Sequence, residues 1–279
     1  MHSMEISHTA NQRLEDFESS FSLDAAHSLN GPLFTGVDLG TTYIVTAVVD
    51  QKGFPVAGML TRSLSSIRDG LILDYVGAIS ILREQVHKIH SHGFPLQGAA
   101  AAYPPGTAGR NARAFGNVLE AVGLDVQILT DEPTAASMVL EISNGAVVDI
   151  GGGTTGISVI KSGKVVYTAD EPTGGIHVDL VIAGHYKIKD HEAEKMKRDP
   201  RRQTEIFPLI RPVFQKMATI VRNHLRNHPV KTLYLVGGTS CFPGIKEVME
   251  DETGLNVLQP KNPLLVTPLG IALSLLIKN

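Results

Sequence analysis

The sequence predicts a duplicated α/β fold in which two similar lobes face each other across a cleft. One observation is an internal repeat of a strand, a glycine-rich turn and a second strand. The other is the length of 279 residues, which suits two lobes because single hydrophobic cores stop growing near ~250–300 residues. A hydrophobic content of 43% and a formal net charge of -3 are typical of an ordinary globular protein.

The second copy of the repeat, residues 147–160 (VVDIGGGTTGISVI), also fits the dinucleotide fingerprint G-x-G-x-x-G. That fingerprint requires its glycines to open a helix. Here residues 157–160 alternate at period two, and a turn at 161–164 leads to the β-type residues 165–167. The segment therefore predicts a β-hairpin, which excludes a Rossmann dinucleotide site.

The first copy lies nearer the N-terminus, at residues 36–49 (GVDLGTTYIVTAVV), and a turn at 50–53 leads from it to a third strand. Asp38 and Asp149 occupy equivalent places in the two copies. Glycines let backbone N–H groups approach phosphate oxygens, threonine hydroxyls add donors, and carboxylates hold Mg²⁺ or its waters. We therefore expect the two turns to clamp phosphates between the lobes.

Composition excludes several function classes. Lys and Arg are scattered rather than gathered in a stripe, so we expect no nucleic-acid partner. No apolar stretch approaches the ~18 residues of a membrane span, and the N-terminus has no secretory signal pattern. The single cysteine, Cys241, leaves no pair for an internal disulfide. These features predict a cytoplasmic protein.

Residues 1–33 differ from the rest of the chain, because Ser, His, Asn and acidic residues dominate them up to a break at residues 30–32 (NGP). This composition predicts a disordered tail. The alternative is a short docking helix for a partner or shell, since Leu14, Phe17 and Phe21 are spaced i, i+3, i+7.

The order of the motifs resembles that of the actin, sugar-kinase and heat-shock-chaperone ATPase superfamily. The two hairpins resemble its phosphate-1 and phosphate-2 motifs, and residues 131–136 (DEPTAA) are similar to a segment of DnaK-type chaperones. Residues 193–198 (AEKMKR) resemble the adenosine-side helix, and 233–239 (LYLVGGT) the adenosine motif. Residues 101–106 and 268–273 look like the connecting segments. The resemblance implies duplicated actin-like, ribonuclease-H-like lobes around a central nucleotide cleft.

A closer resemblance is carried by five short strings: 104–107 (PPGT), 149–157 (DIGGGTTGI), 169–175 (ADEPTGG), 217–221 (MATIV) and 267–269 (TPL). They are similar to the ethanolamine-utilization protein J (EutJ) family. The resemblance implies a cytosolic actin-like ATPase that acts as a chaperone-like, reactivating or assembly factor. Its implied partners are ethanolamine ammonia-lyase or the proteins of the ethanolamine-utilization microcompartment.

The same resemblance implies a site for ATP and Mg²⁺. Asp38 and Asp149 would hold Mg²⁺ through its waters, and Glu132 would lie near the attacking water. These three residues would be the catalytic ones. The nucleotide would contact residues of both lobes: Gly40, Thr41, Thr42, Gly151, Gly152, Gly153, Thr154, Thr155, Gly174, Gly175, Glu194, Lys197, Gly237, Gly238 and Thr239.

Other interpretations of some of these residues stay open. Glu132 also suits the first turn of a helix beside Pro133, where the helix dipole stabilises a carboxylate. Glu194 and Lys197, expected beside the nucleoside, also suit a solvated helical face because the run around them is so polar.

The sequence departs from the superfamily pattern in ways that predict slow turnover. Gly156 stands where an acidic residue is usual. Residues 176–177 (IH) follow the glycine pair 174–175, where an acidic residue is also usual. Cys241 stands where DnaK-type chaperones have an Arg. The equivalent of the chaperones' catalytic lysine is not assigned by the sequence, and three residues are candidates: Lys52, Arg62 and Arg68.

We expect lobe I at residues 34–145 together with a C-terminal helix at 263–279, and lobe II at 146–262. Two function classes follow from the site. The first is a weak ATPase, favoured by the three carboxylates. The second is a non-enzymatic nucleotide-sensing scaffold, or a filament former like the cell-shape actin MreB, favoured by the missing carboxylate at Gly156.

Overall fold

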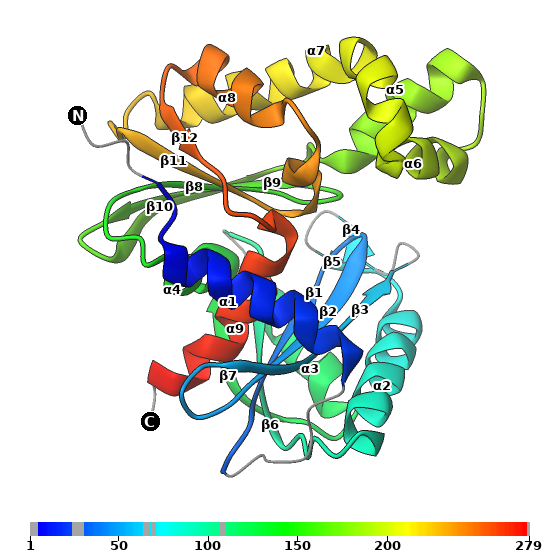
Figure 1. The fold of residues 1–279 in the computed structure, drawn as a ribbon, viewed down its shortest axis with the longest axis vertical. Coiled ribbons are helices and arrows are strands. Elements are labelled where there is room, and N and C mark those ends of the chain that lie inside the picture. Colours follow the sequence, from blue (N-terminus) through cyan, green and yellow to red (C-terminus); the bar gives the residue numbers. More distant parts are fainter. Residues whose placement is uncertain (1–4, 24–30, 64–66, 69–70, 106–109, 278–279) are drawn as a thin grey trace.

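The structure, a computed structural model, describes residues 5–23, 31–63, 67–68, 71–105 and 110–277. Two halves are stacked along the long axis of the molecule, each built on its own β-sheet (Figure 1). A small hairpin of β4 (Ile67–Arg68) and β5 (Leu71–Ile72) adds to the first half. Among the described residues, no helix combines the length and the apolar character needed to cross a membrane.

The first sheet has five strands. Across the sheet their order is β3 (Pro55–Arg62), β2 (Tyr43–Val49), β1 (Phe34–Leu39), β6 (Gly98–Tyr103) and β7 (Asp125–Asp131). The β1–β2 and β2–β3 pairs are antiparallel, whereas β1–β6 and β6–β7 are parallel. Parallel neighbours need a crossover, which helices supply here.

The second sheet repeats this plan strand for strand. Its order is β10 (Lys164–Glu171), β9 (Thr155–Lys161), β8 (Gly145–Ile150), β11 (Thr232–Val236) and β12 (Asn256–Leu258). The directions of pairing match those of the first sheet. The predicted duplicated α/β fold is confirmed, and the glycine-rich turn after β8 enters a strand rather than a helix.

The turns of the two hairpins are also alike. The N–H of Gly40 donates to the Tyr43 carbonyl at 2.9 Å, and the N–H of Gly151 donates to the Thr154 carbonyl at 3.0 Å. Asp38 and Asp149 both lie one residue before the end of their strands. The two copies of the repeat therefore share the same hydrogen bond within their turns.

Helices cover the outer face of each sheet. In lobe I these are α2 (Tyr75–Ser91) and α3 (Arg110–Glu120); in lobe II they are α5 (Gly175–Tyr186), α6 (Asp190–Arg198), α7 (Pro200–Leu225) and α8 (Ile245–Thr253). Apolar side chains that alternate along the strands bury against them and form one core per lobe.

Two helices lie between the sheets: α4 (Glu132–Leu140), which follows β7, and α9 (Val266–Ile277), which follows β12 and the short turn η4 (Pro263–Leu265). They cross so closely that a Cβ on Gly270 would overlap the carbonyl oxygen of Ala135. A Cβ on Gly36 of β1 would likewise overlap the backbone of Ala272. The last helix of the chain therefore packs on the sheet of lobe I.

The N-terminal segment forms a helix, α1 (His8–Ser19), in front of α4 and α9 (Figure 1). The Ser7 side chain caps it by accepting from the N–H of Ala10 at 3.1 Å. Leu14 and Phe17 are 0% exposed, in the same core cluster as residues of α4 and α9.

The prediction of a disordered tail is therefore wrong for residues 8–22. Phe17 and Phe21 stack edge to face at 5.1 Å between centroids, and Phe21 lies against Gly58 of β3. At the other side, Lys261 pairs with Glu15. The i, i+3, i+7 spacing did mark a docking face, but that face packs on the chain itself.

We predict that Phe17→Ala lowers the free energy of unfolding by about 3–5 kcal/mol, because it removes a fully buried ring and leaves a cavity. Urea unfolding measures the change. Gln12→Ala, on the exposed side of the same helix, is the control and should change stability by less than about 0.5 kcal/mol. A loss below about 1 kcal/mol for Phe17→Ala would show that α1 does not dock.

Candidate functional site

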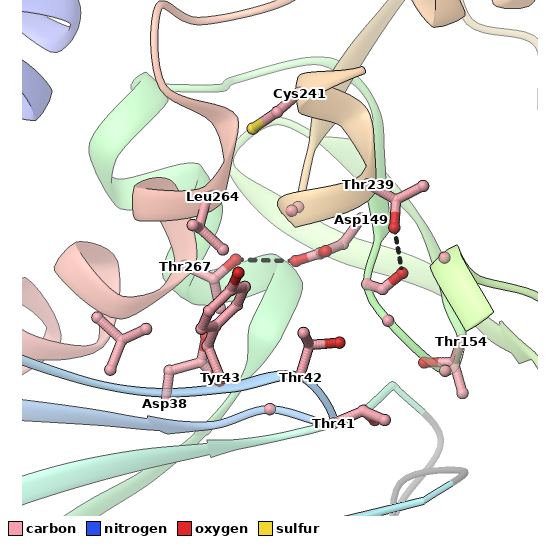
Figure 2. Close-up of a pocket in the computed structure, with 18 of the residues that line it drawn as sticks. Asp38, Thr41, Thr42, Tyr43, Asp149, Thr154, Thr239, Cys241, Leu264 and Thr267 are labelled. Atoms are coloured by element: carbon pink, nitrogen blue, oxygen red, sulfur yellow. Dashed lines mark hydrogen bonds between the residues drawn. The ribbon is translucent and has the colours of Figure 1, made fainter. Parts of the chain in front are cut away.

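A cavity of about 380 Å³ lies between the lobes, and both hairpin turns line it (Figure 2). Most of the predicted site residues line this cavity: Asp38, Gly40, Thr41, Thr42, Glu132, Asp149, Gly151, Gly152, Gly153, Thr154, Gly175, Glu194, Lys197, Gly237, Gly238 and Thr239. Segments far apart in the sequence thus meet at one place.

Thr155 and Gly174 are outside the lining. The Thr155 side chain is fully buried, and its hydroxyl donates to the Thr173 carbonyl at 2.7 Å. The N–H of Gly174 donates to Nδ1 of His177 at 3.2 Å. In this structure both residues support the walls of the cavity.

The glycine loop after β8 is fastened from two sides. From the start of α5, the N–H groups of Gly175 and Ile176 donate to the carbonyls of Gly151 and Gly152 at 3.0 and 2.8 Å. The Thr239 hydroxyl donates to the Gly151 carbonyl at 2.7 Å (Figure 2). The loop is therefore held in shape by its neighbours, with Gly152 lying directly against the Thr42 side chain of the opposite hairpin.

Three carboxylates surround the inner end of the cavity. Burial and the nearby Asp149 raise the pKa of Asp38 to about 7. Burial, followed by the charges of Asp149 and Asp38, raises the pKa of Glu132 well above its ordinary value. Burial also raises the pKa of Asp149. Carboxylates in this arrangement repel one another and favour either protonation or a bound cation.

Glu132 owes its place to a helix start. The Asp131 side chain caps α4 by accepting from the N–H of Thr134 at 2.9 Å, and Pro133 occupies the first turn. The first helical residue is Glu132, and it lines the cavity. The helix-start interpretation and the site interpretation are thus both compatible with its position.

Sequence reasoning missed Thr267, whose hydroxyl donates to Oδ2 of Asp149 at 2.9 Å (Figure 2). A lone threonine in an apolar stretch gives no pattern that marks it as functional. Its neighbour Pro268 offers a signal in retrospect, since α4 also places a proline directly after its cavity residue, Glu132.

At the outer end of the cavity, the side of α6 that carries Glu194 and Lys197 is largely shielded from solvent. Glu194 is only 7% exposed and pairs with Arg62 from the end of β3, in the opposite lobe. Lys197 lies 2.8 Å from Asp179 and donates to the Gly175 carbonyl at 3.2 Å. Burial lowers the pKa of Lys197, an effect that the charge of Asp179 opposes.

The three candidates for the equivalent of the catalytic lysine differ in their positions. Arg62 reaches the cavity rim through its pair with Glu194, whereas Lys52 lies exposed in the turn between β2 and β3. The side chain of Arg68 is outside the described part of the structure. Arg198 adds a second contact across the cleft, with its guanidinium carbon 5.6 Å from the centre of the Tyr43 ring.

Two departures from the superfamily pattern have visible surroundings. A Cβ on Gly156 would lie 3.3 Å from Cγ of Pro105, so a ring from lobe I occupies the space beside this glycine. Cys241 lines the cavity at the end of the turn that follows β11. The cavity wall there is a small thiol in place of a long cation.

Within the described residues, no three His, Cys, Asp or Glu side chains gather as a ligand set for a metal. Mg²⁺ needs fewer protein ligands, because it keeps several waters and is held by one or two carboxylates plus phosphates. Asp38 and Asp149 line the cavity, and a cation would offset both the burial and the charge of Asp149 that raise the pKa of Asp38. The residues present fit a hydrated Mg²⁺.

Paired sheets of one order, with a cavity between their hairpin turns, define a protein of the actin-like ATPase fold. The family model described as MreB/Mbl protein matches residues 60–206, and that described as cell division protein FtsA matches residues 146–270. The crystal structure of MreB5 of Spiroplasma citri bound to ADP aligns with a TM-score of 0.70 at 20% identity, covering 88% of this chain and 98% of that one.

More specifically, the chain belongs to the ethanolamine utilization protein EutJ family. It is 44% identical over 245 residues to EutJ of Escherichia coli strain K12, covering 87% of this chain and 86% of that protein. The crystal structure of EutJ from Carboxydothermus hydrogenoformans aligns with a TM-score of 0.88 at 48% identity, covering 95% of this chain and 97% of that one. The predicted resemblance and the predicted fold are both confirmed.

The carboxyl of Asp38 predicts a pH dependence of stability in the protein without nucleotide. Its pKa is about 7 in the folded chain and ordinarily 3.8. As the pH rises between these values the unfolded chain ionises while the folded chain stays protonated, so stability is lost. Asp38→Asn removes this loss, and we expect it to raise the melting temperature by at least about 2 °C more at pH 8 than at pH 5.

Thermal unfolding followed by circular dichroism, with EDTA present, tests this expectation. Asp125→Asn, an exposed residue at the start of β7, is the control and should behave alike at both pH values. Equal shifts for Asp38→Asn at pH 5 and pH 8 would contradict the prediction.

Proposed function

We propose that the protein binds ATP with Mg²⁺ in the cavity between its lobes and hydrolyses it slowly. The observation that supports this most directly is the placement of two equivalent hairpin turns, each with an Asp at its base, on one cavity. Backbone N–H groups of residues 40–42 and 151–154 would cradle the β- and γ-phosphates. Actin-like relatives of known structure include MreB5 of Spiroplasma citri bound to ADP and bound to AMPPNP.

Asp38 and Asp149 would hold Mg²⁺ through its waters, and the bound ion would neutralise phosphate charge. Glu132 would accept a hydrogen bond from the attacking water and, because its pKa is raised, could take the proton at its carboxylate. Glu194 and Lys197 would contact the nucleoside, with Gly237, Gly238 and Thr239 behind the base. The departures at Gly156 and Cys241 support slow rather than fast turnover.

The biological role we propose is chaperone-like: reactivation or assembly of ethanolamine ammonia-lyase or of the ethanolamine-utilization microcompartment, in the cytoplasm. The ethanolamine-utilization name of the relatives supports the setting. Closure of the lobes on ATP would give a two-state element that a partner could detect.

We predict that Glu132→Gln lowers steady-state phosphate release from ATP at least about tenfold, because a general base in the water step contributes 10²–10⁴-fold in enzymes. Affinity for MgADP, measured by titration calorimetry, should stay within threefold of wild type. Glu141→Gln, an exposed residue just after α4, is the matched control and should leave both quantities unchanged.

Three outcomes have different consequences. Absence of any adenine-nucleotide binding at millimolar concentration would refute the proposed site. Binding without phosphate release above that of Asp149→Ala would favour the alternative of a nucleotide-sensing scaffold. A nucleotide-dependent pellet on sedimentation would favour the filament alternative.

The partner proposal has its own test. Purified protein added to inactivated ethanolamine ammonia-lyase should restore lyase activity with MgATP, and should not restore it with MgATP when Asp149→Ala replaces the wild type. Equal recovery with and without nucleotide would contradict a nucleotide-driven reactivating role.

A further inference from the structure

Thr267 lies in the first turn of α9 and bonds outside its own helix. It is the second residue of α9 and only 4% exposed. In the middle of a helix such a hydroxyl often bonds the carbonyl three or four residues before it, as Ser274 on the same helix does by donating to Ile271 at 2.6 Å. No residue of α9 stands that far before Thr267. The Thr267 hydroxyl instead donates across the cavity wall to Oδ2 of Asp149, 118 residues away (Figure 2).

The duplication identifies the counterpart of Thr267. Helices α4 and α9 occupy equivalent places after β7 and β12, and Ala135 meets Gly270 where they cross. Counting back three residues from each contact point leads to Glu132 and to Thr267, and a proline follows both. The two residues are therefore equivalent in the two halves, and both line the cavity next to Asp149.

The other oxygen of Asp149 is confined too. A Cβ on Gly237 would overlap Oδ1 of Asp149, and Gly237 has a φ of +92°, which other residues rarely adopt. The N–H of Gly237 donates to the Pro263 carbonyl at 3.0 Å, just before α9. Thr267 of α9 thus holds Oδ2 of Asp149, and Gly237, which bonds to the segment just before α9, lies against Oδ1.

This contact joins the two lobes. Asp149 belongs to β8 of the second sheet, whereas α9 packs on β1 of the first sheet through the close approach of Ala272 to Gly36. We propose that Thr267 is a positioning residue: it holds the Asp149 carboxylate in the orientation that binds a magnesium nucleotide, and couples that orientation to the place of α9 on lobe I. The inference rests on the proposed nucleotide site.

The test is titration calorimetry with ADP, in Mg²⁺ and in EDTA. Thr267→Val keeps the shape of the side chain and removes the donor, so we expect binding of MgADP to weaken about tenfold to a hundredfold, as for one lost hydrogen bond to a charged group. Binding in EDTA should change less than twofold. Thr267→Ser should restore MgADP affinity, and Ser274→Ala on the same helix should leave it unchanged.

A double-mutant cycle decides whether Thr267 acts through Asp149. In an Asp149→Ala background, which removes the acceptor, Thr267→Val should weaken MgADP binding by less than twofold. Equal affinity of Thr267→Val and wild type, failure of Thr267→Ser to restore affinity, or full weakening in the Asp149→Ala background would each overturn the proposal. Should Thr267→Val not fold, Thr267→Ala takes its place in the same cycle.

The result for the wild type separates the two levels of inference. Wild-type binding of MgADP with no effect of Thr267→Val would overturn the role of Thr267 alone. Absence of wild-type binding would overturn the proposed site and this role with it.

Discussion

The close crossing of α4 and α9 is the contact on which the rest of the structure depends. Only a glycine at position 270 lets the two helices approach so far that backbone meets backbone at Ala135. Each helix carries a cavity residue in its first turn, Glu132 or Thr267, and each packs between the two sheets. The spacing of these two site residues is thus set where the helices cross.

The cavity gathers carboxylates at a cost in stability. Burial opposes the ionisation of Asp38, Glu132 and Asp149 and raises the pKa of each, and the charges of neighbouring carboxylates raise the pKa of Asp38 and Glu132 further. The Thr267 hydroxyl, by donating to Asp149, favours the ionised form of that carboxyl and opposes the effect of burial. Sites that sacrifice stability in this way are typical of functional clefts, where a ligand supplies the missing charge.

The parts of the molecule that could be predicted are those with local signals. Period-two alternation on both sides of a Gly/Thr turn predicted both hairpins, and the position of Asp38 and Asp149 within them followed directly. Glu132 was placed in the site by the resemblance of residues 131–136 to a chaperone segment, while Pro133 beside it indicated a helix start. These signals involve residues within a few positions of one another.

What could not be predicted depends on contacts between distant segments. A short helix such as α1 is marginal alone and forms because Leu14 and Phe17 bury against the lobes, which composition does not reveal. The pairs Arg62–Glu194 and Thr267–Asp149 likewise join residues that lie far apart in the sequence. Once the crossing of α4 and α9 is known, comparison of the two halves leads to Thr267.

The same architecture explains why the proposed ATPase should be slow. The glycine loop is already held by α5 and by Thr239, so phosphate binding requires little reorganisation. Beside that loop, however, the ring of Pro105 lies against Gly156, where a further carboxylate would need room. A preformed phosphate-binding site with few groups to activate water favours binding of a nucleotide over its hydrolysis. The state of the bound nucleotide could then influence both lobes through α9, because this helix contacts Asp149 of the second sheet and also packs on the first sheet.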